Sequence, residues 1–175
     1  EDQPTPPPRP MVARGQANPT VWILNGDGEY RGALADKWKR IGQAVFGGIS
    51  HAPVTLHPGG RIWVMNDFKA ETWLDLAGYQ SGHNDTDDNF RWITTGTAAT
   101  TWKTAPVRPY LSLQAPYENH NGAPGGQPMS AAIVLRGQDW SIINAPVPRV
   151  TYGAPGHAGT EAGSRPPAGP SRDVP

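Results

Sequence analysis

Apolar runs and amphipathic segments alternate along the middle of this chain. The string TVWILNGDGEY holds a run of β-branched and aromatic residues that stops at an Asn-Gly-Asp-Gly turn, which is typical of a buried strand in a parallel sheet. The string YRGALADKWKRIGQAVFGG follows, with Trp38, Ile41 and Val45 at helical spacing and two glycines at its end. This pattern is typical of an amphipathic helix with its C-terminal stop. The two segments predict one βα unit.

The alternation continues along the patterned region. Further strands are predicted in APVTLHPGG, in WLDLAGYQSGH up to Tyr79, in RPYLSLQAPYENH and in PRVTYG, and helices in TDDNFRWITTGTAATTW and SAAIVLRGQDWSIINAP. A helical turn is expected near FKAETW, and the TDDN segment is expected to cap the helix that contains Phe90. The pattern predicts an α/β fold of parallel β/α units, with about five strands covered by helices.

Proline and glycine mark the ends of the chain. Of its 175 residues 20 are proline and 21 glycine, and they crowd the two termini, where few large apolar residues are present. Such segments bury too little surface to offset the entropy of ordering. We therefore expect a Pro-rich N-terminal arm over residues 1–18, a β/α domain over 19–153 and a Pro/Gly-rich tail over 154–175.

Charge and composition exclude several classes of partner. Lys plus Arg equals Asp plus Glu, at 15 each, so no long-range field favours nucleic acid. No apolar run approaches the length that spans a bilayer, so no membrane partner is expected. The chain has no cysteine, hence no disulfide or thiolate metal site. The compartment is unknown from sequence; a mature exported protein whose signal has been removed would look the same, and a secreted or periplasmic location is favoured over a cytoplasmic one.

Polar side chains follow each predicted strand. Because the carboxyl ends of parallel strands meet at one edge, we expect these side chains to form one site. Carboxylates, amides, imidazoles and aromatic rings together suit a carbohydrate, although any one such residue by itself is as often a helix-capping loop residue. The candidates in chain order are Asn25, Asp27, Glu29, His57, Gln80, Ser81, His83, Gln114, Tyr117, Glu118, His120 and Tyr152.

The strings VWILNGDGEYRG, APVTLHPGG, WLDLAGYQSGH and RPYLSLQAPYENH, in this order, resemble the second half of the apiosidase-like glycoside hydrolases over roughly residues 19–156. The resemblance implies part of a (β/α)8 TIM barrel and hydrolysis of glycosidic bonds in plant or microbial polysaccharide. It implies that Asp27 is the general acid/base. It places Gln114 where the family has its nucleophilic glutamate, and Ala115 where the family has proline.

A neutral amide at position 114 leaves two interpretations. A retaining glycosidase needs two carboxyl groups about 5 Å apart, and an amide forms no stable glycosyl ester. Either Glu118 supplies the second catalytic carboxylate, or the chain is a catalytically impaired relative that binds carbohydrate. About five of the eight strands of a barrel would leave the sheet open. We therefore expect homo-oligomers that cover the open sheet; a longer parent protein is the alternative.

Other chemistries are less well supported. Ser81 and His83, with Asp27 or Asp85, suggest an esterase-type triad, but no G-x-S-x-G elbow is present. The five histidines show no metal-ligand spacing, so neither a metal nor another cofactor is expected. Among the tryptophans, Trp38 and Trp92 are predicted to pack in the core, and Trp63 and Trp102 to stack on sugar.

Overall fold

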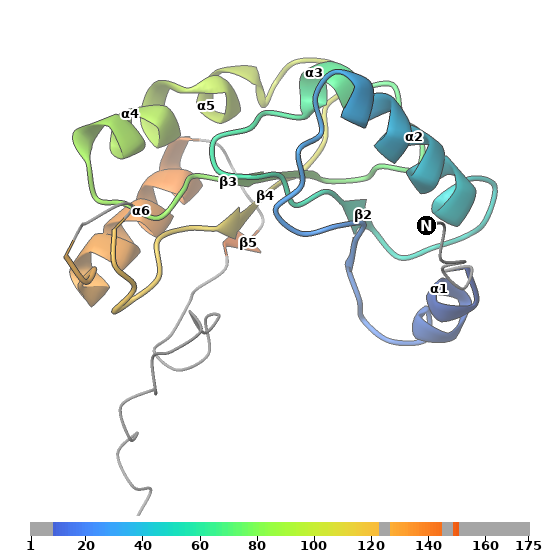
Figure 1. Ribbon diagram of the computed structural model, residues 1–175, viewed down its shortest axis with the longest axis horizontal. Helices are drawn as coiled ribbons and strands as arrows, with labels where there is room; N and C mark the ends of the chain where they lie inside the picture. Colours follow the sequence, from blue (N-terminus) through green and yellow to red (C-terminus); the bar gives the residue numbers. More distant parts are fainter. Residues whose placement is uncertain (1–8, 123–126, 145–148, 151–175) are drawn as a thin grey trace, which may run out of the picture.

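The computed structural model describes residues 9–122, 127–144 and 149–150. Strands occupy the centre, and helices α2 to α5 cover one side of them (Figure 1). The elements in chain order are α1 (Arg9–Gly15), β1 (Trp22–Ile23), α2 (Ala33–Phe46), β2 (Val54–Thr55), α3 (Met65–Phe68), β3 (Ala77–Gln80), α4 (Asp87–Thr95), α5 (Thr97–Thr101), β4 (Tyr110–Gln114), α6 (Ala131–Asn144) and β5 (Arg149–Val150).

The strands pair in parallel and in chain order. Strand β1 pairs with β2, with Trp22 opposite Val54, and a second sheet has the order β3-β4-β5, with Ala77 opposite Tyr110 and Leu111 opposite Arg149. Every pairing joins consecutive strands across an intervening helix or loop. This arrangement confirms the predicted parallel β/α units, and it places all the strands' carboxyl ends on one side.

The two sheets meet at a close junction between β2 and β3. Asp75 N donates to Val54 O at 3.0 Å, the carboxylate of Asp75 accepts from Val54 N at 2.8 Å, and Thr55 Oγ1 donates to Leu76 O at 3.1 Å. Gly78 lies so close to β2 that an added Cβ would fall 2.5 Å from Thr55 Oγ1. The absent side chain therefore lets the two sheets continue as one curved surface.

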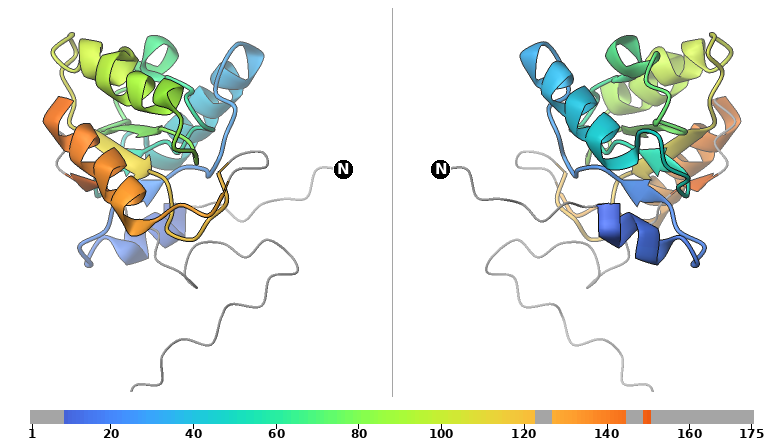
Figure 2. Two further views of the ribbon diagram at one scale, coloured as in Figure 1. Left: turned by 90° about the vertical axis from the view of Figure 1, so that its left-hand side faces the viewer. Right: turned by 90° about the vertical axis from the view of Figure 1, so that its right-hand side faces the viewer.

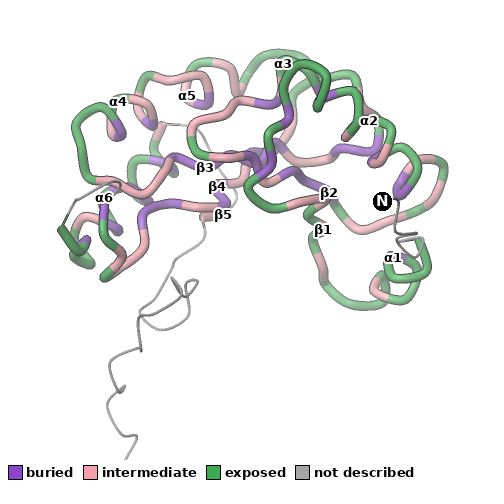
Figure 3. The backbone as a smooth tube through the Cα atoms, viewed as in Figure 1, coloured by how far each residue is buried: buried purple, intermediate pink, exposed green. Residues whose placement is uncertain are grey.

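Two clusters of apolar side chains form the core, and the most buried backbone follows the central strands (Figure 3). The first cluster lies under α2 and includes Tyr30, Phe46, Phe68 and Trp73, all at most 3% exposed. Gly42 of α2 allows this packing, because a Cβ there would fall about 2.5 Å or less from the Trp73 indole. Helix α2 therefore packs on the core through the close approach at Gly42 as well as through its apolar side chains.

The second cluster lies between the three-stranded sheet and helices α4 and α5. Ala77, Tyr79, Ala98 and Tyr110 are buried in it, and the partly buried side chains packed against it include Trp63, Trp92 and Trp102.

The tryptophan predictions have different outcomes. Trp38, packed against the first cluster, and Trp92 are core residues as predicted. The prediction that Trp63 and Trp102 stack on sugar stays a prediction. Both pack on the core, and the Trp63 ring lies 5.2 Å from Tyr110, the first residue of β4 and therefore at the opposite end of this strand from Gln114.

Helix α1 packs onto the domain, although its residues lie in the segment interpreted as an arm. Val12 is 1% exposed, and the Arg9 guanidinium donates to Ala44 O at 2.6 Å and to Gly47 O at 2.9 Å. These two carbonyls belong to the C-terminal end of α2, where the last helical C=O groups lack intrahelical partners. Figure 2 shows α1 on the side of the strands opposite α4 and α5. The tail from residue 151 lies outside the described residues.

The helix predicted over TDDNFRWITTGTAATTW is two helices. Thr86 caps α4, its side chain accepting from Asn89 N at 3.3 Å, which confirms the predicted cap. Gly96 then adopts extended backbone between α4 and α5, consistent with its low helix propensity. Within the described part of the chain, no helix is long and apolar enough to cross a bilayer.

Replacing Gly78 by alanine tests the junction between β2 and β3. Overpacking of this kind lowers the free energy of unfolding by about 1–3 kcal/mol. We expect Gly78→Ala to lower the urea midpoint with an unchanged slope, by the loss of free energy divided by that slope. The control is Gly26→Ala, where no atom lies within 4 Å of the added Cβ, and its effect should stay below about 0.5 kcal/mol. Equal effects of the two substitutions would contradict the close approach.

Candidate functional site at the strand ends

The loops after β1 and β2 are joined by backbone hydrogen bonds. His57 N donates to Asn25 O at 3.3 Å, and Gly28 N donates to His57 O at 3.0 Å. Tyr30 Oη also donates to Asn25 O, at 2.9 Å, and burial raises the pKa of Tyr30 to about 12, so this hydroxyl remains a donor. The main chain of Asn25 is therefore fixed, and Asp27 projects from the loop with a φ of 46°.

Asp27 is anchored at one oxygen and open to solvent. Its Oδ1 accepts a hydrogen bond from Gln80 Nε2 at 2.5 Å, while its side chain is 71% exposed. Its backbone N donates to His57 Nδ1 at 3.4 Å, and the same imidazole nitrogen lies 3.6 Å from Oδ1. A carboxylate held in this way has a fixed orientation and a face available to a ligand.

Gln80 is the buried residue that holds Asp27. It is the last residue of β3 and only 4% exposed, and its Nε2 also donates to Pro58 O at 2.8 Å. One amide group thus links the ends of three strands. A buried amide with both N–H donors satisfied has one favoured orientation.

The side chains of Gln114 and His83 form the second half of the site. Gln114 is the last residue of β4, and its Nε2 contacts His83 Nε2. If the amide nitrogen donates, the imidazole accepts at Nε2 and carries its proton on Nδ1. The His83 ring lies 4.6 Å from Tyr117 and 4.9 Å from His120, measured between ring centroids. Three rings from two loops therefore pack beside the amide of Gln114.

The electrostatics link the two halves. Burial lowers the pKa of His83, with a further decrease from the nearby His120 and an opposing increase from Asp27. Burial also raises the pKa of Tyr117, and the negative charge of Asp27 raises it further. The charge of Asp27 thus acts on residues after β3 and after β4. We use the name strand-end cluster for the set of Asp27, His57, Gln80, His83, Gln114, Tyr117 and His120.

Ser81 lies beside this cluster without taking part in a nucleophilic pair. It is fully buried, and its Oγ has no hydrogen-bond partner among the described residues. Its backbone N donates to Gln114 O at 3.2 Å, which sets the spacing of β3 and β4. Gly82 follows with a φ of 96° and turns the chain toward His83. The Ser–His contact that an esterase requires is not formed in the described part.

The remaining candidates have different surroundings. Glu29 is exposed and forms a two-bond ion pair with Arg31, whose guanidinium lowers the pKa of Glu29. Glu118 is half-buried in the turn after Tyr117, where Asn119 has a φ of 60° and donates its N–H to Met129 O at 2.9 Å. Tyr152 lies outside the described residues. The structure therefore brings most of the predicted residues together, while the carboxylate of Glu29 is paired with Arg31.

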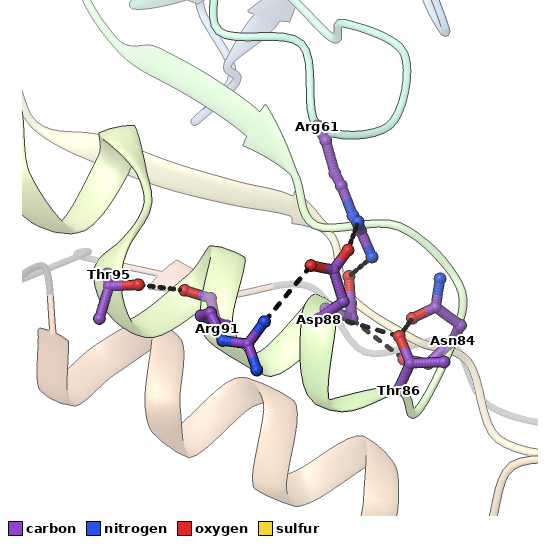
Figure 4. Close-up of polar contacts among 7 residues, drawn as sticks. Arg61, Asn84, Thr86, Asp88, Arg91 and Thr95 are labelled. Atoms are coloured by element: carbon purple, nitrogen blue, oxygen red, sulfur yellow. Dashed lines mark hydrogen bonds and ion pairs between the residues drawn. The ribbon is translucent and has the colours of Figure 1, made fainter.

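Sequence reasoning did not identify Arg61. Its guanidinium donates to Asp88 at 2.5 Å and to Asn89 Oδ1 at 3.3 Å, and its backbone N donates to Gln80 O at 2.9 Å. Figure 4 shows Arg61 reaching from the loop after β2 to the start of α4. The pair Arg61 and Asp88 is 27 residues apart, so no local pattern indicates it.

A metal site is not formed by these side chains. Among the residues that the structure describes, no group of three or more His, Asp or Glu side chains is arranged to hold a metal ion. The side chains of the strand-end cluster can supply hydrogen bonds, stacking and proton transfer.

Parallel β/α units with carboxylate, amide and aromatic side chains gathered at the strand ends define part of a TIM barrel of the glycoside hydrolase type. The chain belongs to the apiosidase-like catalytic domain family, whose model matches residues 8–161. No curated protein matches the chain.

Two solved structures share the fold. One is a glycoside hydrolase family 5 protein from Bacteroides vulgatus ATCC 8482, 21% identical, with a TM-score of 0.66 over 83% of this chain. The other is described as a glycoside hydrolase, also 21% identical, with a TM-score of 0.69 over 90% of this chain. The chain spans 33% and 40% of the lengths of these two proteins. The family and the partial barrel are thus as the resemblance implied.

The lowered pKa of His83 predicts a pH dependence of stability. Between its folded pKa and the ordinary value of 6.5, the unfolded state binds more protons than the folded state, so stability rises with pH there and falls on acidification below about 6.5. We expect His83→Gln to make the free energy of unfolding less dependent on pH between about 5 and 6.5. The measurement is urea unfolding across that range. At pH 8 the difference in free energy of unfolding between the variant and the parent protein gives the loss of packing alone. An unchanged pH dependence of this free energy between about 5 and 6.5 would contradict the prediction.

Proposed function

We propose that the strand-end cluster binds a saccharide of plant or microbial polysaccharide, and that its hydrolytic activity is impaired because Gln114 occupies the nucleophile's position. The observation that carries the proposal is the contact between Gln114 and His83 at the end of β4, across the strand ends from Asp27. The resemblance implies that position 114 is that of the nucleophilic glutamate, so the amide there takes the place of one of the two carboxylates of a glycosidase site. Membership of the apiosidase-like family supports the class of ligand.

The groups of the cluster match the chemistry of a sugar. Tyr117 and the two imidazoles beside it supply ring faces for the C–H surface of a pyranose. Asp27 is 71% exposed at its side chain and can accept from a hydroxyl while Gln80 holds its Oδ1. Binding requires no second carboxylate, so it survives the substitution at position 114.

Hydrolysis does require a second carboxylate. In a retaining mechanism one carboxylate attacks the anomeric carbon, and an acid protonates the departing oxygen. Gln114 is neutral, and therefore it neither forms a glycosyl ester nor stabilises the positive charge of the transition state. Asp27 retains its role as acid/base in this proposal, with Gln80 as its positioning residue.

The substitution Gln114→Glu should restore turnover. The introduced carboxylate would attack the anomeric carbon as Asp27 gives its proton to the leaving oxygen; Asp27 would then take a proton from the water that cleaves the glycosyl ester. We expect kcat/KM on aryl glycosides to rise about 100-fold or more, in line with the contribution of a positioned catalytic group. Release of the aryl alcohol, measured over a panel of glycosides, provides the test.

Two variants control this experiment. Gln43→Glu makes the same change on an exposed position of α2 and should leave turnover at the parent level. Asp27→Asn, combined with Gln114→Glu, should remove the gain. If the parent protein already turns over glycosides and Gln114→Glu adds nothing, the proposed impairment is wrong.

A second candidate is hydrolysis in which Glu118 supplies the missing carboxylate. It is favoured by the position of Glu118, half-buried in the turn directly after Tyr117 of the cluster. In that case the parent protein is active, and Glu118→Gln abolishes its turnover. With the impaired site, Glu118→Gln has no turnover to remove, so the same assays separate the two candidates.

We also propose that the chain forms homo-oligomers through its open side. Strand β1 pairs on one edge with β2, and no other described strand pairs with it. Val21 and Ile23 at this strand are 48% and 47% exposed. Unpaired parallel edges with apolar side chains favour association. Light scattering at several concentrations should give a mass above 18.8 kDa; Ile23→Lys should lower it, and a monomer at all concentrations would contradict the proposal.

A further inference from the structure

A second candidate site lies on the outer helices, apart from the strand-end cluster. Helices α4 and α6 enclose an open groove of about 340 Å³ that is lined by Asp87, Phe90, Arg91, Thr94, Arg136 and Trp140. The helices that form this groove lie next to each other in Figure 1. None of the six residues belongs to the strand-end cluster, so the groove has a chemistry of its own.

The guanidinium of Arg136 is fixed but has no acceptor. It lies over the Phe90 ring, 3.8 Å from the ring centroid. Among the described residues the Arg136 guanidinium has no hydrogen-bond or ion-pair partner. Stacking on an aromatic face orients the plane of a guanidinium and leaves its N–H edge available, and that edge fits a carboxylate with two parallel hydrogen bonds.

Arg91 provides a second cation that is only loosely paired. Its Nη1 lies 3.9 Å from Asp88 Oδ1, and its side chain is 69% exposed (Figure 4). The other oxygen of Asp88 already accepts from Arg61 at 2.5 Å. An anion in the groove therefore competes with a long, solvent-exposed ion pair that contributes little by itself.

Trp140 supplies an apolar face. Trp140 is 40% exposed, so part of its indole ring is available to pack on a ligand. Asp87 and Thr94 add acceptors for hydroxyl groups at the other wall. Two guanidinium groups, one indole and these acceptors fit a ring that carries both a carboxylate and hydroxyls.

We propose that this groove binds a uronate, a sugar ring with a carboxylate, as a saccharide site separate from the strand-end cluster. The carboxylate pairs with Arg136 and Arg91, and the ring packs on Trp140. The site requires no catalysis. It stands independently of the proposed function, because its residues and its ligand charge differ from those at the strand ends.

The probe is tri-galacturonic acid, with the neutral cellotriose as the comparison, titrated by calorimetry and by the indole N–H signal of Trp140 in NMR spectra. We expect saturable binding of the acid, at least about tenfold tighter than the neutral sugar and weakened by salt. Arg136→Ala and Trp140→Ala should each weaken it about tenfold or more. Arg40→Ala, which removes an exposed arginine of α2, should have no effect.

Two further variants keep the test sharp. Arg136→Lys retains the charge without the planar fork, and should weaken binding even if Arg136→Ala fails to fold. Asp27→Asn should leave uronate binding unchanged, so failure of the groove and failure of the strand-end site are distinguishable. Equal affinity for cellotriose, no loss in Arg136→Lys, or loss of uronate binding in Asp27→Asn would each overturn the proposal.

Discussion

The side-chain amide of Gln80 is the interaction on which the site depends. It is buried at the end of β3, and its two N–H groups donate to Asp27 after β1 and to the carbonyl of Pro58 after β2. Its backbone carbonyl accepts from Arg61, whose guanidinium holds the start of α4. A buried amide leaves few donors or acceptors unsatisfied, because each unmade hydrogen bond costs about 1–3 kcal/mol. One side chain thus orients an exposed carboxylate and joins the ends of three strands.

The other half of the site holds a neutral amide, Gln114, against the imidazole of His83. A carboxylate at position 114 would favour protonation of His83, whereas Gln114 presents a neutral contact. Burial and the neighbouring His120 lower the pKa of His83 in the same direction. The neutral imidazole and the neutral amide are therefore mutually consistent. The charge of Asp27 acts on both His83 and Tyr117.

The two proposed sites use different parts of the fold. The strand ends gather short polar side chains from successive loops, because parallel strands direct all their carboxyl ends to one edge. The groove between α4 and α6 depends instead on long cationic side chains and an exposed indole on the outer helices. The chain spans 33% and 40% of the lengths of its two structural neighbours. Both groups of residues lie within this part of a barrel.

The amino-acid sequence by itself determined the alternation of strands and helices after residue 19 and the side of the sheet that carries the polar residues. Helical spacing in α2, apolar runs in β1 and β4, and polar residues directly after the strands are local patterns, and the parallel topology converts them into one site containing Asp27, His57 and Gln114. Only the tertiary structure decided which partner each side chain has. Arg61 with Asp88, Arg9 with the end of α2, and Trp63 with Tyr110 join residues 27 to 47 positions apart. Such contacts depend on the distance between packed elements, as between Gly78 and β2. The periodicity of apolar residues along the chain does not give that distance.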